Sequence, residues 1–255
     1  MFKLDEIAED IYRISVFVPE FNLGFNHFLV KDEEPLLFHA GFRRMFPIVR
    51  EAVAKIMDPS KLRHIGFSHF ESDECGALNH WLEIAPNSQA VCGLVGCMVT
   101  VNDFANREAR PLTRDDVLST GKRRFRFVPT PHIPHGWDAG VMFEETGQTL
   151  FCSDLFLQAG ECPPVTESSV IDHVRKDLIT FEGGPFAGAT PYTHHTEVVM
   201  KELAALHPRT LAIMHGSSYS GDGARAITEL ASVLHEVLGP REAEDSSVLS
   251  AARNI

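Results

Sequence analysis

HFESDE, residues 69–74, places four side chains that can bind a metal ion within six residues. In an extended segment alternate side chains point to one side, so His69, Glu71 and Asp73 would share a face. A helix is predicted to begin near Glu74, where the helix dipole favours negative charge. The alternative is that Asp73 or the preceding serine only caps this helix while Glu71 is solvated.

Three predicted strands end in a side chain of this kind. Residues 62–68 lead to His69, residues 149–153 lead to Asp154, and residues 210–214 lead to His215. Ligand sites in α/β sheets lie at the carboxyl ends of the strands, so we expect the three side chains to meet there. Taken singly, an aspartate after a strand is more often a turn residue than a ligand.

The loop 130–138, TPHIPHGWD, contains two further histidines that could bind a metal ion. Its prolines and glycine suit a loop that holds an imidazole in one orientation, and either His132 or His135 could supply it. The alternative is a surface loop with exposed histidines.

The rest of the chain alternates strands with helices, which predicts an α/β fold. The predicted strands are 7–17, 26–30, 35–39, 62–68, 89–92, 124–128, 140–144, 149–153 and 210–214. The predicted helices are 46–57, 74–85, 168–178, 196–206 and 224–238. We expect one metal-binding domain over residues 1–240 and a loose polar tail over 241–255.

The composition of the chain limits the kinds of molecule that it is expected to bind. The formal net charge of −12 disfavours nucleic acid and anionic membranes. No apolar run approaches the roughly 20 residues of a membrane helix, and the acidic N-terminus is unlike a secretory signal, so we predict a cytoplasmic protein. The five cysteines lack CxxC spacing and are expected to be reduced and buried. Cys75 and Cys152 flank expected ligands, but no base is evident beside either, so neither is expected to be a nucleophile.

In this order the signals resemble the metallo-β-lactamase superfamily. Its ligands come from an HxHxDH loop, a later histidine, an aspartate that ends a strand, and a final histidine. The HxExDE form found here is similar to the HxExDH loop of the flavodiiron branch. The segments 135–139, 149–156 and 26–30 resemble motifs of the same proteins. The likeness spans about residues 10–240 and implies an αββα four-layer sandwich with two mixed β-sheets.

The resemblance also implies a ligand set. One metal ion would bind His69, Glu71 and His135, the other would bind Asp73 and His215, and Asp154 would bridge them. His135 is preferred to His132 because Asp138 then keeps the spacing of the family. Independently, three carboxylates nearly balance two divalent cations. An oxygen-rich donor set favours iron or manganese over zinc.

The chain departs from the family pattern at several positions. Glu74 replaces a loop histidine and is interpreted as an additional ligand or a helix-start residue. His39 replaces an aspartate and either supports the site or packs. Trp137, Tyr192 and His194 are further candidates for support or for lining a pocket, although core packing is favoured for Trp137 and threonine caps with exposed histidines are favoured for residues 192–196. No flavin motif follows Gly239, so we expect no FMN and no built-in electron donor.

Two functions compete. The first is a non-haem diiron protein that binds oxygen or nitric oxide, or reduces it with electrons from a separate redox donor. The second is a dinuclear hydrolase with zinc or manganese, acting on an ester, thioester, lactone, lactam or phosphodiester. A metal-stabilised binding module is a third option. Family members with this domain are often homodimers, which makes a homodimer an expectation here as well.

Overall fold

The computed structural model describes residues 1–240, and the predicted tail at 241–255 lies outside the described residues. Two seven-stranded sheets form the centre of the molecule. The first has the order β1-β2-β3-β4-β5-β6-β7. Its strands are Lys3–Ala8, Ile11–Val18, Leu23–Val30, Leu36–Phe38, His64–Gly66, Gln89–Gly93 and Arg110–Leu112. Strands β1 to β4 pair antiparallel and β4 to β7 pair parallel, so the sheet is mixed.

The second sheet has the order β12-β14-β13-β11-β10-β9-β8 and is also mixed. In chain order its strands are Val117–Ser119, Arg124–Pro129, Gly140–Glu144, Thr149–Phe151, Val165–Thr166, Thr210–Ala212 and Ser218–Ser220. Strands β11 and β13 are parallel neighbours in its middle, in the register Phe151 to Ala212. These two strands therefore end side by side at one edge of the sheet.

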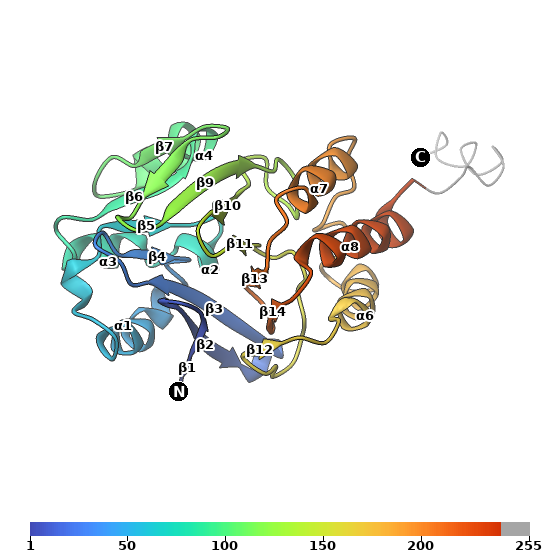
Figure 1. Ribbon diagram of the computed structural model, residues 1–255, viewed down its shortest axis with the longest axis horizontal. Coiled ribbons are helices and arrows are strands. Elements are labelled where there is room, and N and C mark those ends of the chain that lie inside the picture. The colour runs from blue at the N-terminus through green and yellow to red at the C-terminus, as the bar shows by residue number, and fades with distance from the viewer. Residues whose placement is uncertain (241–255) are drawn as a thin grey trace, which may run out of the picture.

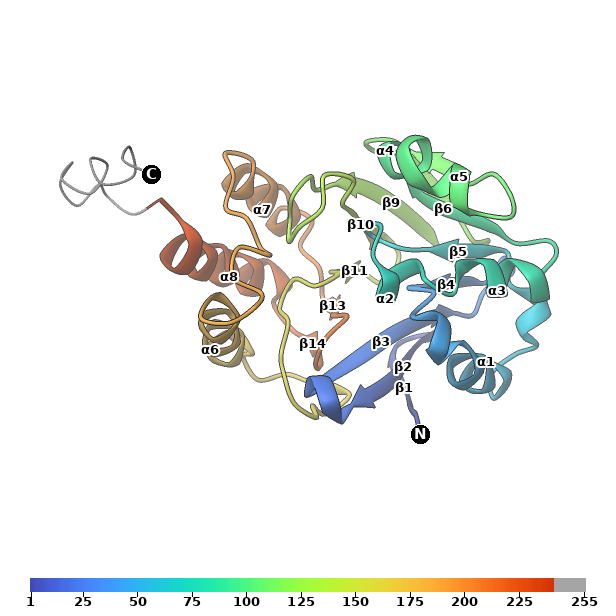
Figure 2. The same ribbon diagram turned by 180° about the vertical axis from the view of Figure 1, so that it is seen from behind.

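Helices cover the two outer faces. On the first sheet lie α1 (Phe46–Ala54), α2 (Ser72–Cys75) and α3 (Leu78–Ile84), with the short α4 (Leu94–Gly96) and α5 (Asn102–Phe104) near β6. On the second sheet lie α6 (Ile171–Glu182), α7 (Thr196–Ala204) and α8 (Gly223–Leu238), as both views show (Figures 1 and 2). Short single-turn helices occupy Pro19–Phe21, Arg43–Met45 and Pro59–Lys61, and a wider turn of helix occupies Cys97–Val101.

Three buried clusters match these layers. One packs α1 and α3 on the first sheet around Trp81, and another packs α6, α7 and α8 on the second sheet around Leu230. The third lies between the sheets, where Phe151 contacts Phe28 and Phe38 with ring centroids 5.6 and 5.2 Å apart. The predicted αββα sandwich with two mixed sheets is confirmed.

Several predicted boundaries are wrong. The single strand predicted at 7–17 is a hairpin of β1 and β2, because Asp10 takes a left-handed turn conformation with φ of 55°. The helix predicted at 74–85 is two short helices, α2 and α3, interrupted at Gly76 and Ala77. Strands β7, β8, β12 and β14 were not predicted, because they are short and partly exposed, whereas the equally short β4, β5, β11 and β13 are fully buried runs. Within residues 1–240, no helix is long and apolar enough to cross a bilayer.

Candidate metal centre

Three of the expected ligands follow three strands at the same offset. His69 lies three residues after the end of β5, Asp154 three residues after β11, and His215 three residues after β13. Because β11 and β13 are parallel neighbours, Asp154 and His215 emerge from adjacent strand ends. His69 arrives from the facing sheet, so the centre lies at the carboxyl edge where the two sheets meet.

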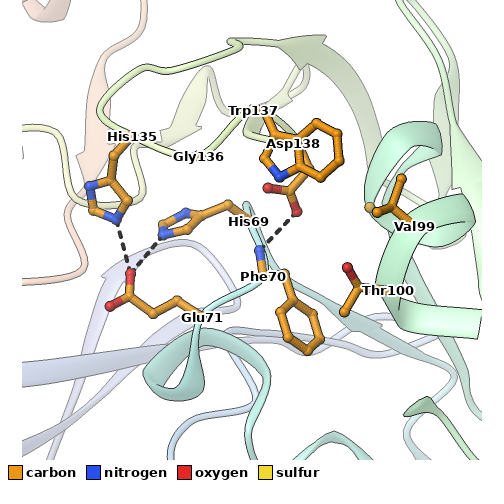
Figure 3. A pocket seen from close by; sticks show the side chains of 10 residues that line it. His69, Phe70, Glu71, Val99, Thr100, His135, Gly136, Trp137 and Asp138 are labelled. Atoms are coloured by element: carbon orange, nitrogen blue, oxygen red, sulfur yellow. Dashed lines mark hydrogen bonds and ion pairs between the residues drawn. The ribbon is translucent and has the colours of Figure 1, made fainter. Parts of the chain in front are cut away.

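One group of side chains gathers around Glu71. Its Oε2 atom lies 3.1 Å from Nε2 of His69 and 2.9 Å from Nε2 of His135, contacts that Figure 3 draws as dashed lines. The Oδ2 atom of Asp154 completes the group, at 3.6 Å from His69 and 3.3 Å from His135. One ligand atom from each of the four residues lies within 4.8 Å of all the others, a spacing that a single metal ion can span.

A second group shares Asp154 with the first. The other carboxylate oxygen, Oδ1, lies 3.1 Å from Nε2 of His215, and that same nitrogen lies 3.5 Å from Oδ2 of Asp73. Asp154 thus presents one oxygen to each group. This geometry is what a bridging carboxylate requires.

Burial and hydrogen bonding indicate that the donors fit a metal pair. Oδ1 of Asp73 is buried and has no hydrogen-bond partner among residues 1–240, which is costly unless another group satisfies it. Nδ1 of His215 lies 2.8 Å from the carbonyl oxygen of Gly24, so the ring donates there and turns Nε2 toward Asp154. Metal-binding histidines are commonly held by such a bond on the other ring nitrogen.

The charges in the centre are strongly coupled. Burial lowers the pKa of His69 and of His215, but the neighbouring carboxylates more than offset this effect and raise both pKa values to about 10. The carboxylates responsible are Glu74, Glu71 and Asp154 for His69, and Asp154 and Asp73 for His215. Contact with His135 and with His69 lowers the pKa of Glu71 to about 2. Carboxylates that hold their neighbours in the charged form also attract divalent cations, which compete with protons for the imidazoles.

Glu74 lies behind the His69 ring, on the side opposite the Nε2 atom that faces Glu71. Its side chain is fully buried, and its carboxylate accepts hydrogen bonds from the backbone N–H and hydroxyl of Ser68 at 2.7 and 2.6 Å and from the hydroxyl of Ser153 at 3.0 Å. Oε1 lies 3.5 Å from Nδ1 of His69, on the opposite side of the ring from the Nε2 atom that faces Glu71. Nδ1 of His69 lies 3.1 Å from the hydroxyl oxygen of Ser68 and 3.4 Å from that of Ser153, so Glu74 supports the His69 ring through these two hydroxyls, and its oxygens are used within the protein.

His39 belongs to the same network. Its Nε2 atom lies 3.5 Å from Oε1 of Glu74, and its Nδ1 atom lies 3.2 Å from the carbonyl oxygen of Asn26. The ring also packs on Phe38, with centroids 4.6 Å apart. Of the two interpretations of His39, support and packing, the structure shows contacts of both kinds.

Of the two histidines in the loop 130–138, His135 lies beside the other expected ligands and His132 does not. His135 reaches Glu71 and Asp154, whereas His132 is outside the group of four and bonds through its backbone N–H to the carbonyl oxygen of Gly136. Oδ2 of Asp138 accepts the backbone N–H of Phe70 at 2.9 Å, which ties this loop to the 69–74 loop (Figure 3).

A cavity of about 200 Å³ opens beside the first group. Trp137 lines it, with more than half of its surface exposed, together with Phe70, Val99 and Thr100 (Figure 3). His69, Glu71 and His135 also line this cavity, so it reaches the first group of side chains.

Two expected pocket residues lie elsewhere. The Tyr192 hydroxyl donates to Glu197 at 3.1 Å and lies 3.1 Å from Nδ1 of His235, while the ring of His194 contacts that of His195 at 3.8 Å between centroids. Neither residue lines the cavity or belongs to the group of four, since residues 192–195 lead into α7 on the outer face of the second sheet. Capping of α2 by Ser72 or Asp73 is also wrong, since Glu71 is the N-cap residue and makes no side-chain cap bond.

Sequence reasoning missed three residues that position the ligands, namely Ser68, Ser153 and Asn26, and it did not foresee that the carboxylate of Asp138 accepts the backbone N–H of Phe70. The available signal was that Ser68 and Ser153 each immediately precede a ligand, His69 and Asp154. Ser153 also adopts a left-handed conformation with φ of 55°, which turns the chain at that point. Such strained positions concentrate at functional sites.

Comparison with known proteins identifies a family that matches most of this chain. A family model described as "ODP family beta lactamase" matches residues 23–216. The flavo-diiron protein FprA2 of Clostridium acetobutylicum is 22% identical over 241 residues, covering 88% of this chain and 59% of that protein. The chain thus spans less than two thirds of the length of this curated relative.

Solved structures share the fold. Rubredoxin oxygen:oxidoreductase from Desulfovibrio gigas superposes with a TM-score of 0.76 at 17% identity, covering 90% of this chain and 61% of that one. A flavoprotein from Thermotoga maritima superposes with a TM-score of 0.76 at 22% identity, covering 91% and 61%. At these identities the likeness establishes the architecture.

Proposed function

This chain belongs to the family described as ODP family beta lactamase, and from that premise we propose that it is a non-haem diiron protein that binds or reduces a small diatomic gas, oxygen or nitric oxide. The relatives named as flavo-diiron protein and rubredoxin oxygen:oxidoreductase support the direction of the proposal. Those relatives are longer than this chain, and their activity is inferred for this chain only as part of the present proposal.

The single observation that carries the proposal is the placement of Asp154. One carboxylate oxygen faces His69 and His135 and the other faces His215, so the residue can bridge two metal ions. In this assignment His69, Glu71 and His135 hold one ion, and Asp73 and His215 hold the other. Two reduced irons, when bound, supply electrons and coordination positions to a gas molecule.

The donor set supports iron. Glu71, Asp73 and Asp154 carry three negative charges against four positive charges of two divalent ions, which leaves the buried site nearly balanced. Glu71 adds an oxygen donor to the group that contains His69 and His135, and harder donors suit iron or manganese better than zinc. The small cavity beside this group supports a small ligand.

The protein contributes orientation and shielding. Gly24 holds the ring of His215, and the hydroxyls of Ser68 and Ser153, which are bonded to Glu74, hold the ring of His69. Asp138 holds the backbone of the 69–74 loop. Trp137 and Phe70 form the rim through which a ligand would pass. Electrons for a reductase would come from a donor outside the αββα unit, and a homodimer and a cytoplasmic location stay predictions.

The test is elemental analysis of the purified protein, followed by its absorption spectrum after anaerobic iron loading and exposure to oxygen. The proposal expects about two irons per chain and a charge-transfer band in the near-ultraviolet or visible range that appears on oxygenation. Two zinc ions per chain, with iron that neither loads nor responds to oxygen or nitric oxide, would contradict the proposal and favour the dinuclear hydrolase.

A further inference from the structure

Two cysteines outside the metal centre bring their sulfur atoms within 3.2 Å of each other. Cys92 lies in β6, and Cys97 begins the wide helical turn Cys97–Val101. The side chains are 3% and 1% exposed, and both are free thiols. The pair has no recognisable motif spacing, and the fold alone brings the sulfurs together.

The turn between them is shaped by close packing. A Cβ atom added to Gly96 would lie 3.1 Å from Oδ2 of Asp138, and one added to Gly93 would lie 3.2 Å from the carbonyl oxygen of Asp138. Two glycines therefore let residues 93–96 fold tightly against the 130–138 loop. This tight turn returns the chain so that Cys97 faces Cys92.

We propose that Cys92 and Cys97 are a redox-active pair that forms a reversible disulfide when hydrogen peroxide oxidises the protein. The Cys97 sulfur attacks one peroxide oxygen, the O–O bond breaks, and the departing hydroxide takes the thiol proton and leaves as water. The Cys92 sulfur then displaces hydroxide from the sulfenic acid on Cys97, forming the S–S bond and a second water. Two thiols and one peroxide thus give one disulfide and two waters.

The geometry needs little adjustment. A disulfide bond is about 2.05 Å long, so the sulfurs must approach by roughly 1.2 Å from their present separation. The contact between the two sulfurs lowers the pKa of Cys97 and raises the pKa of Cys92. Because the thiolate is the attacking form, these directions support Cys97 as the sulfur that reacts first.

The other cysteines provide a contrast. Burial raises the pKa of Cys152 and of Cys75, and the sulfur of each contacts a backbone carbonyl oxygen. Cys162 is partly exposed, and its sulfur also lies near backbone carbonyls, at 3.8 Å. Among the described residues, the 92–97 pair is thus the place where an oxidised sulfur has a second thiol within reach.

The bond would form in the wall of the cavity beside the metal centre. The segment that begins at Cys97 carries Val99 and Thr100, which line this cavity together with His69. Gly96 packs on Asp138, whose carboxylate holds the backbone of Phe70. Oxidation would therefore fix the wall of the cavity to β6, whichever reaction the metal centre performs.

The test uses the full chain, reduced, freed of reductant and treated with a small excess of hydrogen peroxide. After alkylation under denaturing conditions, cleavage at glutamates releases residues 84–108, which contain Cys92 and Cys97 and no other cysteine. We expect this peptide to be unalkylated and lighter by two hydrogen atoms, and to regain both thiols with dithiothreitol. A peptide with both thiols alkylated, or with sulfinic acid and no cross-link, overturns the proposal.

Variants assign the steps. In Cys92→Ser the sulfenic acid should persist on Cys97 and react with dimedone, whereas Cys97→Ser should give no dimedone adduct on Cys92. Cys162→Ser is the matched control and should retain the disulfide of the wild type. Labelling of Cys92 instead of Cys97 would contradict the assigned order, and the mass of the wild-type peptide decides the proposal even if a variant does not fold.

Discussion

At the scale of single residues, the centre depends on carboxylates with distinct tasks. Glu71 faces two imidazoles from the solvent side, and Asp154 presents one oxygen to each group. The oxygens of Glu74 accept hydrogen bonds behind His69. All three side chains are carboxylates in the same part of the molecule, but their hydrogen-bond partners differ. These partners distinguish the expected ligands, Glu71 and Asp154, from Glu74, which supports His69. A carboxylate whose oxygens already accept protein donors has little left for a cation.

Asp154→Ala removes the oxygens shared by the two groups. We expect the metal content of the purified variant to fall sharply, with affinity at least 10- to 100-fold lower, because even residues behind the ligands cost this much. Elemental analysis against Asp116→Ala checks the prediction, since Asp116 is an exposed acid that bonds Thr113. Unchanged metal content in Asp154→Ala would refute the bridging assignment.

The buried His27 is expected to make the folding stability of the protein depend on pH. Burial lowers its pKa from 6.5 to about 4, so between these values the unfolded chain binds more protons than the folded one. Its contribution is present above pH 6.5 and is lost as the pH falls toward 4, on the order of 3 kcal/mol in total. The free energy of unfolding in urea should depend less steeply on pH in His27→Gln than in the wild type. Equal slopes between about pH 7 and about pH 4 would contradict this prediction.

At the scale of elements, the break between α2 and α3 positions Asp73. Gly76 ends α2, where its N–H bonds to the carbonyl oxygen of Ser72 at 3.0 Å, and the next N–H, of Ala77, turns to the carbonyl of Gly41 at 2.7 Å. A continuous helix over 74–85 would leave no such turn. The short α2 therefore keeps the 69–74 loop against the sheet edge.

Gly76→Ala tests this element. A Cβ atom there would lie 2.4 Å from the carbonyl oxygen of Ser72, so the backbone must shift. We expect a loss of about 1–3 kcal/mol of stability and lower metal content, because α2 carries Asp73. Gly183→Ala is the matched control, since its Cβ would lie 3.5 Å from the carbonyl oxygen four residues earlier. Equal thermal unfolding and metal content in both variants would contradict the role of this break.

At the scale of the whole molecule, the centre exists because two sheets are joined at one edge. Asn26 of β3 makes this join: its side-chain amide donates to the carbonyl oxygens of Ile213 and Gly216 at 2.8 and 2.9 Å, and its backbone N–H donates to Met214 at 2.9 Å. Gly24 of the same strand accepts the ring N–H of His215. The first sheet thereby orients a ligand that belongs to the second.

Asn26→Ala removes two of these bonds inside the protein. We expect a loss of about 1–3 kcal/mol, because the carbonyl oxygen of Ile213 loses its donor while that of Gly216 keeps the Arg13 guanidinium, together with reduced metal content as His215 loses its orientation. Asn79→Ala is the control, because Asn79 also bonds backbone groups through its side chain, at Phe104 and Asn106, but in the α3 region. Chemical denaturation should show a loss in both variants, and a normal metal content in Asn26→Ala would disprove the coupling.

The sequence by itself determined the class of the fold and the order in which metal-binding side chains leave the strands. These follow from local patterns, since buried strand runs before His69, Asp154 and His215 are legible along the chain. Tertiary structure alone decided that His135 and not His132 approaches Glu71, that Glu74 turns toward Ser68 and Ser153, and that Tyr192 and His194 lie outside. The physical reason is that spacing along a chain sets only which face a side chain shares with its neighbours. Distances between segments far apart in sequence, including the 3.2 Å between Cys92 and Cys97, depend on how turns and sheets pack.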